Sequence, residues 1–146
     1  MTPPIPSFAR AGALLAVNLT FLMLWGFAGI SKVIDGMPPW FAGKFGPTIL
    51  GRFPGLTATF WLFTVSELLA LALAAAALLR IEFLGQHRPL WLSATLAWSL
   101  FVFLQLGFGQ WLTGEFTGGL QMFTCSGVTL VALQFVGGGI PSDRRP

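Results

Sequence analysis

Four long apolar stretches follow one another along the chain, separated by segments rich in polar residues, glycine or proline. They cover residues 11–30, 56–79, 90–108 and 120–136. A helix needs about 20 apolar residues to cross the hydrocarbon core of a bilayer, so each stretch has roughly the length of one crossing. The pattern predicts an all-α fold, an integral membrane four-helix bundle that forms a single transmembrane domain over residues 1–146.

The longest connection, residues 31–55, mixes proline and glycine with aromatic and aliphatic residues. Such a composition is typical of a segment that lies at the membrane interface, as a short amphipathic or re-entrant piece. Trp40 is then expected at the level of the lipid headgroups. The sequence therefore predicts a long first extramembrane loop that stays close to the bilayer.

The composition agrees with a lipid environment. Of the 146 residues, 55% are hydrophobic and 9% are charged, whereas a soluble domain carries about 25% charged residues. The chain has too few polar side chains to cover a surface in water, so its main partner is predicted to be the lipid bilayer. The net charge of +3 comes without a basic stripe, and no nucleic-acid binding is expected.

The basic residues serve instead as a topology signal. Those on the side of the two termini are Arg10, Arg80, Arg88, Arg144 and Arg145. Those on the opposite side are Lys32, Lys44 and Arg52. Because Lys and Arg are enriched in cytoplasmic loops, this distribution predicts that both termini face the cytoplasm.

Glu67 lies inside the second apolar stretch, which otherwise contains no charge. A carboxylate at membrane depth costs a few kcal/mol, and such residues usually face a protein interior and mark a functional site. Steps of three and four residues place it on one helix face with Phe60, Thr64, Ala70 and Ala74. Glu67 is therefore the candidate catalytic residue, with a purely structural role as the alternative.

Other polar residues fall at a similar depth, counted at about 1.5 Å per helical residue. Asn18, Ser99 and Thr129 could form a layer with Glu67 near the midplane, although the sequence does not decide whether they face one another. Lys32 is expected just past the end of the first helix, too far out for direct contact with Glu67. It would instead cap a cleft whose floor is Glu67.

This cleft would be lined by polar groups at both ends and by aromatic walls. Such a pocket suits a flat amphipathic ligand, for example a quinone head group. The predicted ligand-binding residues are Lys32, Asn18, Trp25, Trp98 and Gln105. In the alternative interpretation, the aromatic residues face lipid or the interface and the glutamine lies at a solvated helix end.

Two short motifs resemble those of the DoxX-like family of small membrane proteins. Residues 27–32, FAGISK, place G-x-x-K at the end of the first helix, and residues 66–70, SELLA, place a lone Glu within the second. The resemblance implies a four-helix protein of the bacterial cytoplasmic membrane. Members include membrane subunits of thiosulfate:quinone oxidoreductases and partners in other membrane oxidoreductase complexes. Lys32 and Glu67 are the positions that match the family pattern.

The chain shows no motif for a cofactor or a metal ion, and Cys125 is its single cysteine. We therefore expect an accessory or structural subunit of a larger redox-linked membrane complex, whose other membrane subunits supply any cofactor, rather than an enzyme acting alone. One alternative is a quinone-interacting oxidoreductase subunit in which Glu67 exchanges a proton with a quinone oxygen. A further alternative is a small proton-coupled transporter formed by dimerisation around Glu67.

Overall fold

A computed structural model describes residues 7–84 and 88–137, and these residues contain helices and turns but no strand. The long helices are α1 (Ser7–Asp35), α3 (Leu56–Leu79), α4 (Leu90–Leu112) and α5 (Phe116–Gly137). The shorter elements are α2 (Pro39–Phe45), the π-helical turn η1 (Gly51–Gly55) and the 3₁₀ turn η2 (Glu82–Leu84). The predicted all-α fold is confirmed.

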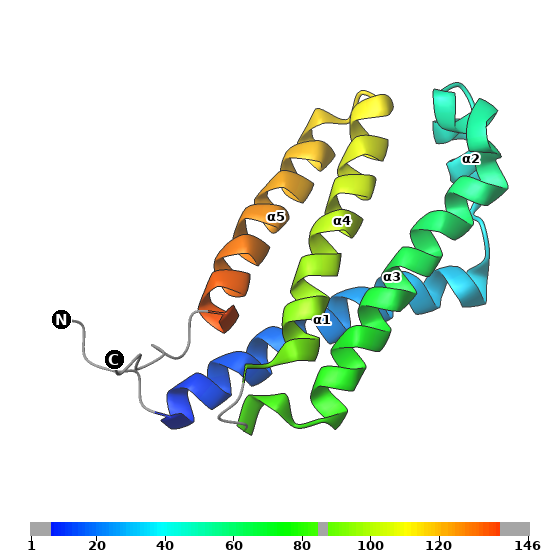
Figure 1. Ribbon diagram of the computed structural model, residues 1–146. Coiled ribbons are helices and arrows are strands. Elements are labelled where there is room, and N and C mark those ends of the chain that lie inside the picture. Colours follow the sequence, from blue (N-terminus) through cyan, green and yellow to red (C-terminus); the bar gives the residue numbers. More distant parts are fainter. Residues whose placement is uncertain (1–6, 85–87, 138–146) are drawn as a thin grey trace.

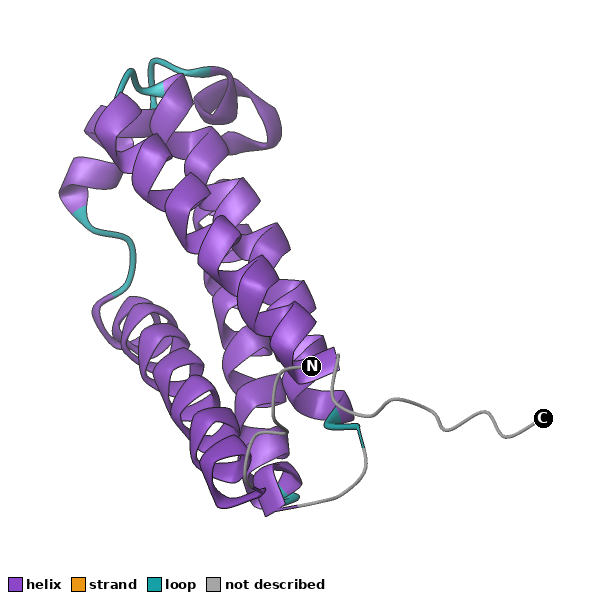
Figure 2. Cartoon of the chain, turned by 90° about the vertical axis from the view of Figure 1, so that its left-hand side faces the viewer, coloured by secondary structure: helices purple, strands orange, loops and turns teal. Residues whose placement is uncertain are grey.

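The long helices form three packed pairs, α1 with α3, α3 with α4, and α4 with α5 (Figure 1). The start of α1 and the end of α5 lie at one end of the bundle, whereas α2 lies at the other end beside the start of α3. Figure 1 shows that α1 is inclined to the other long helices and that the segment after its end leads toward α2. Figure 2 shows the described part of the chain from the side, with helices joined by short loops. The last turn of α1 therefore meets α3 along its length rather than at its end.

Local sequence explains where the helices begin and end. Proline at the first position of α2, Pro39, has no N–H to leave unsatisfied. At the start of α4, the carboxylate of Glu82 accepts hydrogen bonds from the backbone N–H groups of Trp91 (3.0 Å) and Leu92 (2.9 Å) and so caps the helix. Gly114, with φ of 76°, makes the tight turn between α4 and α5.

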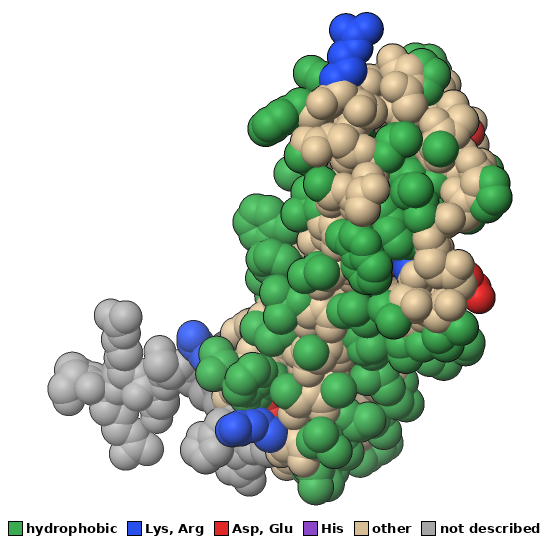
Figure 3. Space-filling view, turned by 90° about the vertical axis from the view of Figure 1, so that its right-hand side faces the viewer, with side chains coloured by type: hydrophobic (Ala, Val, Ile, Leu, Met, Phe, Trp, Pro, Cys, Tyr) green, Lys and Arg blue, Asp and Glu red, His purple; other side chains and the backbone are tan. Residues whose placement is uncertain are grey.

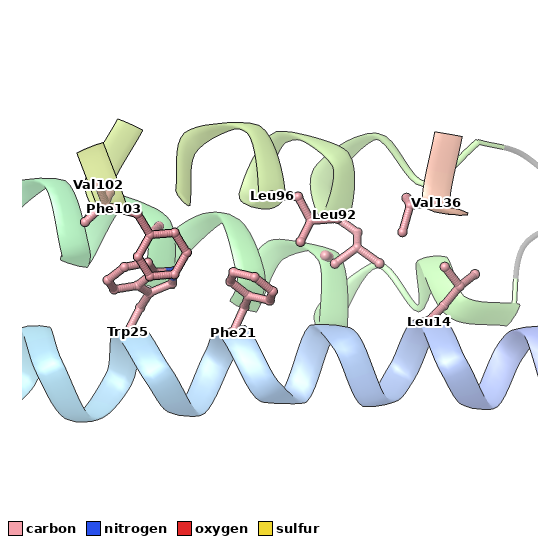
Figure 4. Close-up of a cluster of buried hydrophobic side chains, with 10 residues drawn as sticks. Leu14, Phe21, Trp25, Leu92, Leu96, Val102, Phe103 and Val136 are labelled. Atoms are coloured by element: carbon pink, nitrogen blue, oxygen red, sulfur yellow. The ribbon is translucent and has the colours of Figure 1, made fainter. Parts of the chain in front are cut away.

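The main core lies between α1, α3 and α4. Leu14, Phe21 and Trp25 of α1 point toward α4 (Figure 4). The residues that meet them include Leu92, Leu96, Val102 and Phe103 of α4 and Val136 of α5. The fully buried residues that α3 adds to this core are small, Ala70 and Ala77, and the partly buried Leu71 packs against it. Since lipid is as apolar as these side chains, close packing and interhelical hydrogen bonds hold such helices together.

The surface fits a membrane-embedded bundle. All four long helices are long and apolar enough to cross a bilayer. Hydrophobic side chains cover much of the face shown in Figure 3, while the largest groups of Lys and Arg atoms lie toward its two ends. Large apolar side chains such as Phe27, Val65, Phe101 and Phe123 are exposed on all four helices. The chain is thus a multi-pass membrane protein surrounded by lipid, as predicted.

Three of the four helices are longer than predicted. The α3 helix covers the predicted range 56–79, but α1 extends beyond 11–30 at both ends, α4 runs to Leu112 and α5 begins at Phe116. The predicted loop 31–55 accordingly starts only after Asp35 and contains α2 and η1. The predicted helices were ended at the first charged or glycine-rich position. A helix can continue through such a position when its side chains form hydrogen bonds or ion pairs. Arg144 and Arg145 lie outside the described residues.

Candidate functional site

Glu67 forms an ion pair inside the bundle. Its side chain is 1% exposed, and its Oε1 accepts a hydrogen bond from Nζ of Lys32, whose side chain is 30% exposed. The expectation that these two residues stay apart was therefore wrong. Lys32 belongs to the last turn of α1, which runs to Asp35, and the inclination of α1 brings this turn to the level of Glu67 rather than to the end of α3.

Glycine on α1 permits this approach. A Cβ atom added to Gly29 would lie 3.0 Å from Cδ2 of Leu68, and one added to Gly26 would lie 3.6 Å from Cδ1 of Leu71. The two helices therefore cross with almost no space between them at Gly29. Lys32 follows Gly29 by nearly one turn, so its side chain reaches the neighbouring residue of α3, Glu67. The G-x-x-K motif thus has a direct geometric meaning.

The second carboxylate oxygen of Glu67 takes no part in the ion pair with Lys32. Its Oε2 is buried and has no hydrogen-bond partner among the described residues. Leaving a buried polar atom unsatisfied costs about 1–3 kcal/mol, more when it is charged, and most such atoms in proteins are paired. The oxygen therefore keeps an unused capacity to accept a hydrogen bond or a proton.

Glu67 and Lys32 open onto a cavity of about 530 Å³ between α1, α2, α3 and α4. This volume lies in the range that holds small ligands. Aromatic side chains make up much of its wall: Trp40, Phe41, Phe45, Phe60 and Phe63. Their rings pack against one another, with centroids 4.6 Å apart for Phe41 and Phe45 and 5.5 Å apart for Phe41 and Phe60. The cavity therefore places an aromatic cluster beside the ion pair of Lys32 and Glu67.

A second polar group lies on the same cavity. Nζ of Lys44, on α2, donates to Oε1 of Gln110, on α4, at 2.9 Å. The same ammonium group pairs with Oε2 of Glu115 at 3.0 Å. Lys44 and Gln110 line the cavity, whereas Glu115 does not. These contacts tie α2 to the end of α4 and give the cavity a second set of hydrogen-bonding groups.

Most of the predicted ligand-binding residues lie elsewhere. Nε1 of Trp25 donates to Oγ of Ser99 at 2.8 Å, and Nε1 of Trp98 donates to the carbonyl of Ser66 at 2.9 Å. Both indoles thus join helices to one another and do not line the cavity. Gln105 is also absent from its wall, and its Oε1 is buried without a partner among the described residues.

Asn18 likewise serves the packing of α1 on α3. With its amide turned to satisfy both partners, it donates to the carbonyl of Ala74 at 3.0 Å and accepts from the N–H of Leu78 at 3.1 Å. The hydroxyl of Thr129 donates to the carbonyl of Cys125 in its own helix, at 2.7 Å. The polar layer suggested by depth therefore does not assemble around Glu67, because each side chain is satisfied by a nearer partner.

Sequence reasoning missed Lys44 and the phenylalanines of α2 as cavity residues, whereas Gln110 was expected around the mouth of the cleft. A signal for them exists, since Phe41 and Phe45 are four residues apart and follow Pro39 at a helix start, which is the pattern of a short amphipathic helix. Nothing local indicates that this helix turns back over α3. Its position depends on contacts with Phe60 and Phe63, far along the chain.

Within residues 7–84 and 88–137, no group of three or more His, Cys, Asp or Glu side chains is arranged to hold a metal ion. No protein-family model matches the chain, and no curated protein and no solved structure was found to be similar to it. Chemically, the site offers one unpaired carboxylate oxygen of Glu67, the carboxylate of Asp35, two ammonium groups and an amide beside an aromatic cluster.

Proposed function

We propose that the protein is a membrane subunit of a redox-linked complex and that it binds the head group of a quinone in the 530 Å³ cavity. The observation that carries the proposal is Oε2 of Glu67, buried without a partner among the described residues, at the edge of an aromatic space. A quinol hydroxyl is a donor suited to that oxygen, and its flat ring suits walls made of phenylalanine and tryptophan.

The proposed chemistry at Glu67 is proton exchange. Oxidation of a quinol to a quinone releases two electrons and two protons. Glu67 accepts the first proton from the hydroxyl at Oε2 and passes it toward Asp35, which is exposed and also lines the cavity. The second proton follows the same route. The two electrons go to a cofactor carried by another subunit, and quinone reduction is the reverse sequence.

The motifs around Lys32 and Glu67 support membership of the DoxX-like family as part of this proposal. Their close contact in space gives a physical reason for the pairing of G-x-x-K with a lone Glu. We further propose that the protein resides in the bacterial cytoplasmic membrane with both termini in the cytoplasm. The excess of Lys and Arg on the side of the termini supports this orientation.

A specific observation also favours a docking role for α5. Its buried residues are Gly119, Thr129 and Val136 alone, and its main packing partner is α4. Large apolar side chains of this helix, among them Phe123 and Val131, are exposed. A helix of a cofactor-bearing membrane subunit packed on this face would make the protein an accessory subunit whether or not it also binds quinone.

Ligand binding by the purified protein in lipid nanodiscs tests the main proposal. Decylubiquinol is added under argon. It should quench the tryptophan fluorescence of nanodiscs that contain the wild type more strongly than the fluorescence of empty nanodiscs. Glu67→Gln removes the free anionic oxygen and should weaken binding about 10-fold or more, the loss of one hydrogen bond to a charged group. Ser66→Ala is the matched control, because Ser66 is the neighbouring buried residue and does not line the cavity. Equal affinities of wild type and Glu67→Gln would refute the proposal.

A further inference from the structure

We propose that Lys44 and Gln110 form a second ligand-binding pole in the cavity, opposite Glu67, so that the site selects a ring with two oxygens in a 1,4 relationship. The inference rests on the proposed function and goes beyond it, because it names both ends of the ligand. Glu67 holds the ring through one oxygen, and Lys44 with Gln110 holds it through the other.

The second pole has hydrogen-bond donors to spare. A lysine ammonium group has three N–H donors and a glutamine amide has two. Two of the Lys44 donors are directed at Gln110 Oε1 and Glu115 Oε2, which leaves one. The amide nitrogen of Gln110 donates no hydrogen bond within the described residues. Both side chains line the cavity, so this pole suits an oxygen that accepts hydrogen bonds.

The two poles therefore have opposite character. Oε2 of Glu67 is an acceptor without a donor among the described residues, whereas Lys44 and Gln110 offer donors. A quinol presents a hydroxyl that donates at one side of its ring and an oxygen that accepts at the other. A ligand with a single oxygen satisfies only one of the two poles.

Their separation also fits a ring rather than two adjacent oxygens. A Cβ atom added to Gly109 would lie 3.3 Å from Cε1 of Phe45 and 3.8 Å from Cε2 of Phe63, so this part of α4 lies at the level of Phe63. Gln110 is the next residue, and Glu67 follows Phe63 by about one helical turn. One turn corresponds to about 5.4 Å along the axis, so the two poles lie at different levels of the cavity, as two oxygens on opposite sides of one ring require.

The pole is held in place by its surroundings. Phe41 and Phe45 anchor α2 on Phe60 and Phe63, which fixes the backbone that carries Lys44. Glu115 holds the ammonium group from outside the cavity, and its own backbone N–H donates to the carbonyl of Gln110 at 2.9 Å. Glu115 is therefore a positioning residue for the pole.

Lys44 and Gln110 would make the same contacts if they served only to hold α2 against α4. The test must therefore distinguish this structural role from ligand binding. Gln110→Glu does this, because a carboxylate keeps an acceptor for Lys44 while it removes the amide donors. Binding is measured in nanodiscs, by tryptophan quenching, for decylubiquinol and for the matching monophenol in which one ring hydroxyl is replaced by hydrogen. Lys44→Arg keeps donors at the pole and serves as the conservative variant.

We expect the wild type to bind decylubiquinol about 10-fold more tightly than the monophenol, the effect of one hydrogen bond to a charged group. Gln110→Glu should reduce this preference, because only the spare Lys44 donor remains, and should leave the affinity for the monophenol unchanged, whereas Lys44→Arg should keep the preference. Glu67→Gln should weaken the binding of both ligands. A wild type that binds both ligands equally, or a Gln110→Glu variant that keeps the preference undiminished, would overturn the second pole while leaving quinone binding at Glu67 in force. Absence of binding of either ligand to the wild type would instead overturn the proposed function.

Discussion

Lys32 and Glu67 meet in the interior of the bundle although 35 residues separate them in the chain. Their contact depends on Gly29, which lets the last part of α1 lie directly on Leu68 of α3. The ion pair satisfies one carboxylate oxygen and leaves the other buried without a partner among the described residues, in a side chain that lines a cavity. The ion pair therefore joins α1 to α3 and also places Glu67 at the candidate site.

Removal of the lysine should destabilise the protein. Lys32→Met leaves the carboxylate of Glu67 buried without its ionic partner, and breaking a buried pair from one side costs about 3–5 kcal/mol. We expect a value near the lower end, because Lys32 is partly exposed. Unfolding in detergent, followed by circular dichroism, measures the loss. The double variant Lys32→Met with Glu67→Gln should recover part of it, and strictly additive effects would show that the two residues are not coupled.

Bulk at Gly29 should separate α1 from α3. Gly29→Val adds atoms where a Cβ alone would already lie 3.0 Å from Leu68, and overpacking of this kind costs about 1–3 kcal/mol. Gly12→Val is the control on the same helix, since nothing lies within 4 Å of a Cβ at Gly12. Thermal unfolding of the two variants provides the comparison. Equal melting temperatures would contradict a tight crossing at Gly29.

Asn18 is expected to affect stability and not ligand binding. Asn18→Leu removes the amide that bridges Ala74 and Leu78, and loss of such buried hydrogen bonds costs about 1–3 kcal/mol. Because Asn18 does not line the cavity, the affinity for decylubiquinol should stay within about two-fold of the wild type, less than the effect of one hydrogen bond. A ten-fold weaker affinity at unchanged melting temperature would instead make Asn18 a ligand-binding residue.

The orientation can be tested by labelling. In a Cys125→Ser background, Gly43→Cys places a thiol on α2, and Leu84→Cys places one at the exposed turn η2 at the other end of the bundle. With both termini in the cytoplasm, a membrane-impermeant maleimide added to intact spheroplasts should label the first variant only. Labelling of Leu84→Cys alone would reverse the proposed topology. Both thiols should react after the cells are lysed.

Docking through α5 predicts a difference between two outward-facing positions. Val131→Trp on α5 and Val65→Trp on α3 both enlarge an exposed apolar residue. If a partner helix packs on α5, only Val131→Trp should reduce recovery of a cofactor-bearing subunit in a mild-detergent pull-down, followed by mass spectrometry and an absorbance scan. Equal recovery with both variants would argue against α5 as the docking face.

The sequence alone was enough to locate the four long helices and to place Glu67 on an interior face. Both follow from local properties, namely the length of each apolar stretch and the period of the helix, and α3 spans the predicted residues. The G-x-x-K motif was also visible, but not its contact with Glu67. Residue counts measure depth only for helices that run parallel to one another, and α1 does not.

Which polar residues share the cavity depends on the tertiary packing of the helices. Asn18, Trp25 and Trp98 lie on the right helices but are satisfied by neighbouring backbone or side-chain groups. Lys44 enters the site because α2 folds back onto Phe60 and Phe63 and meets Gln110 across 66 residues of chain. The tilt of α1 and the position of α2 over α3 arise from packing between residues distant in sequence. The local hydrophobic pattern therefore does not predict either of them.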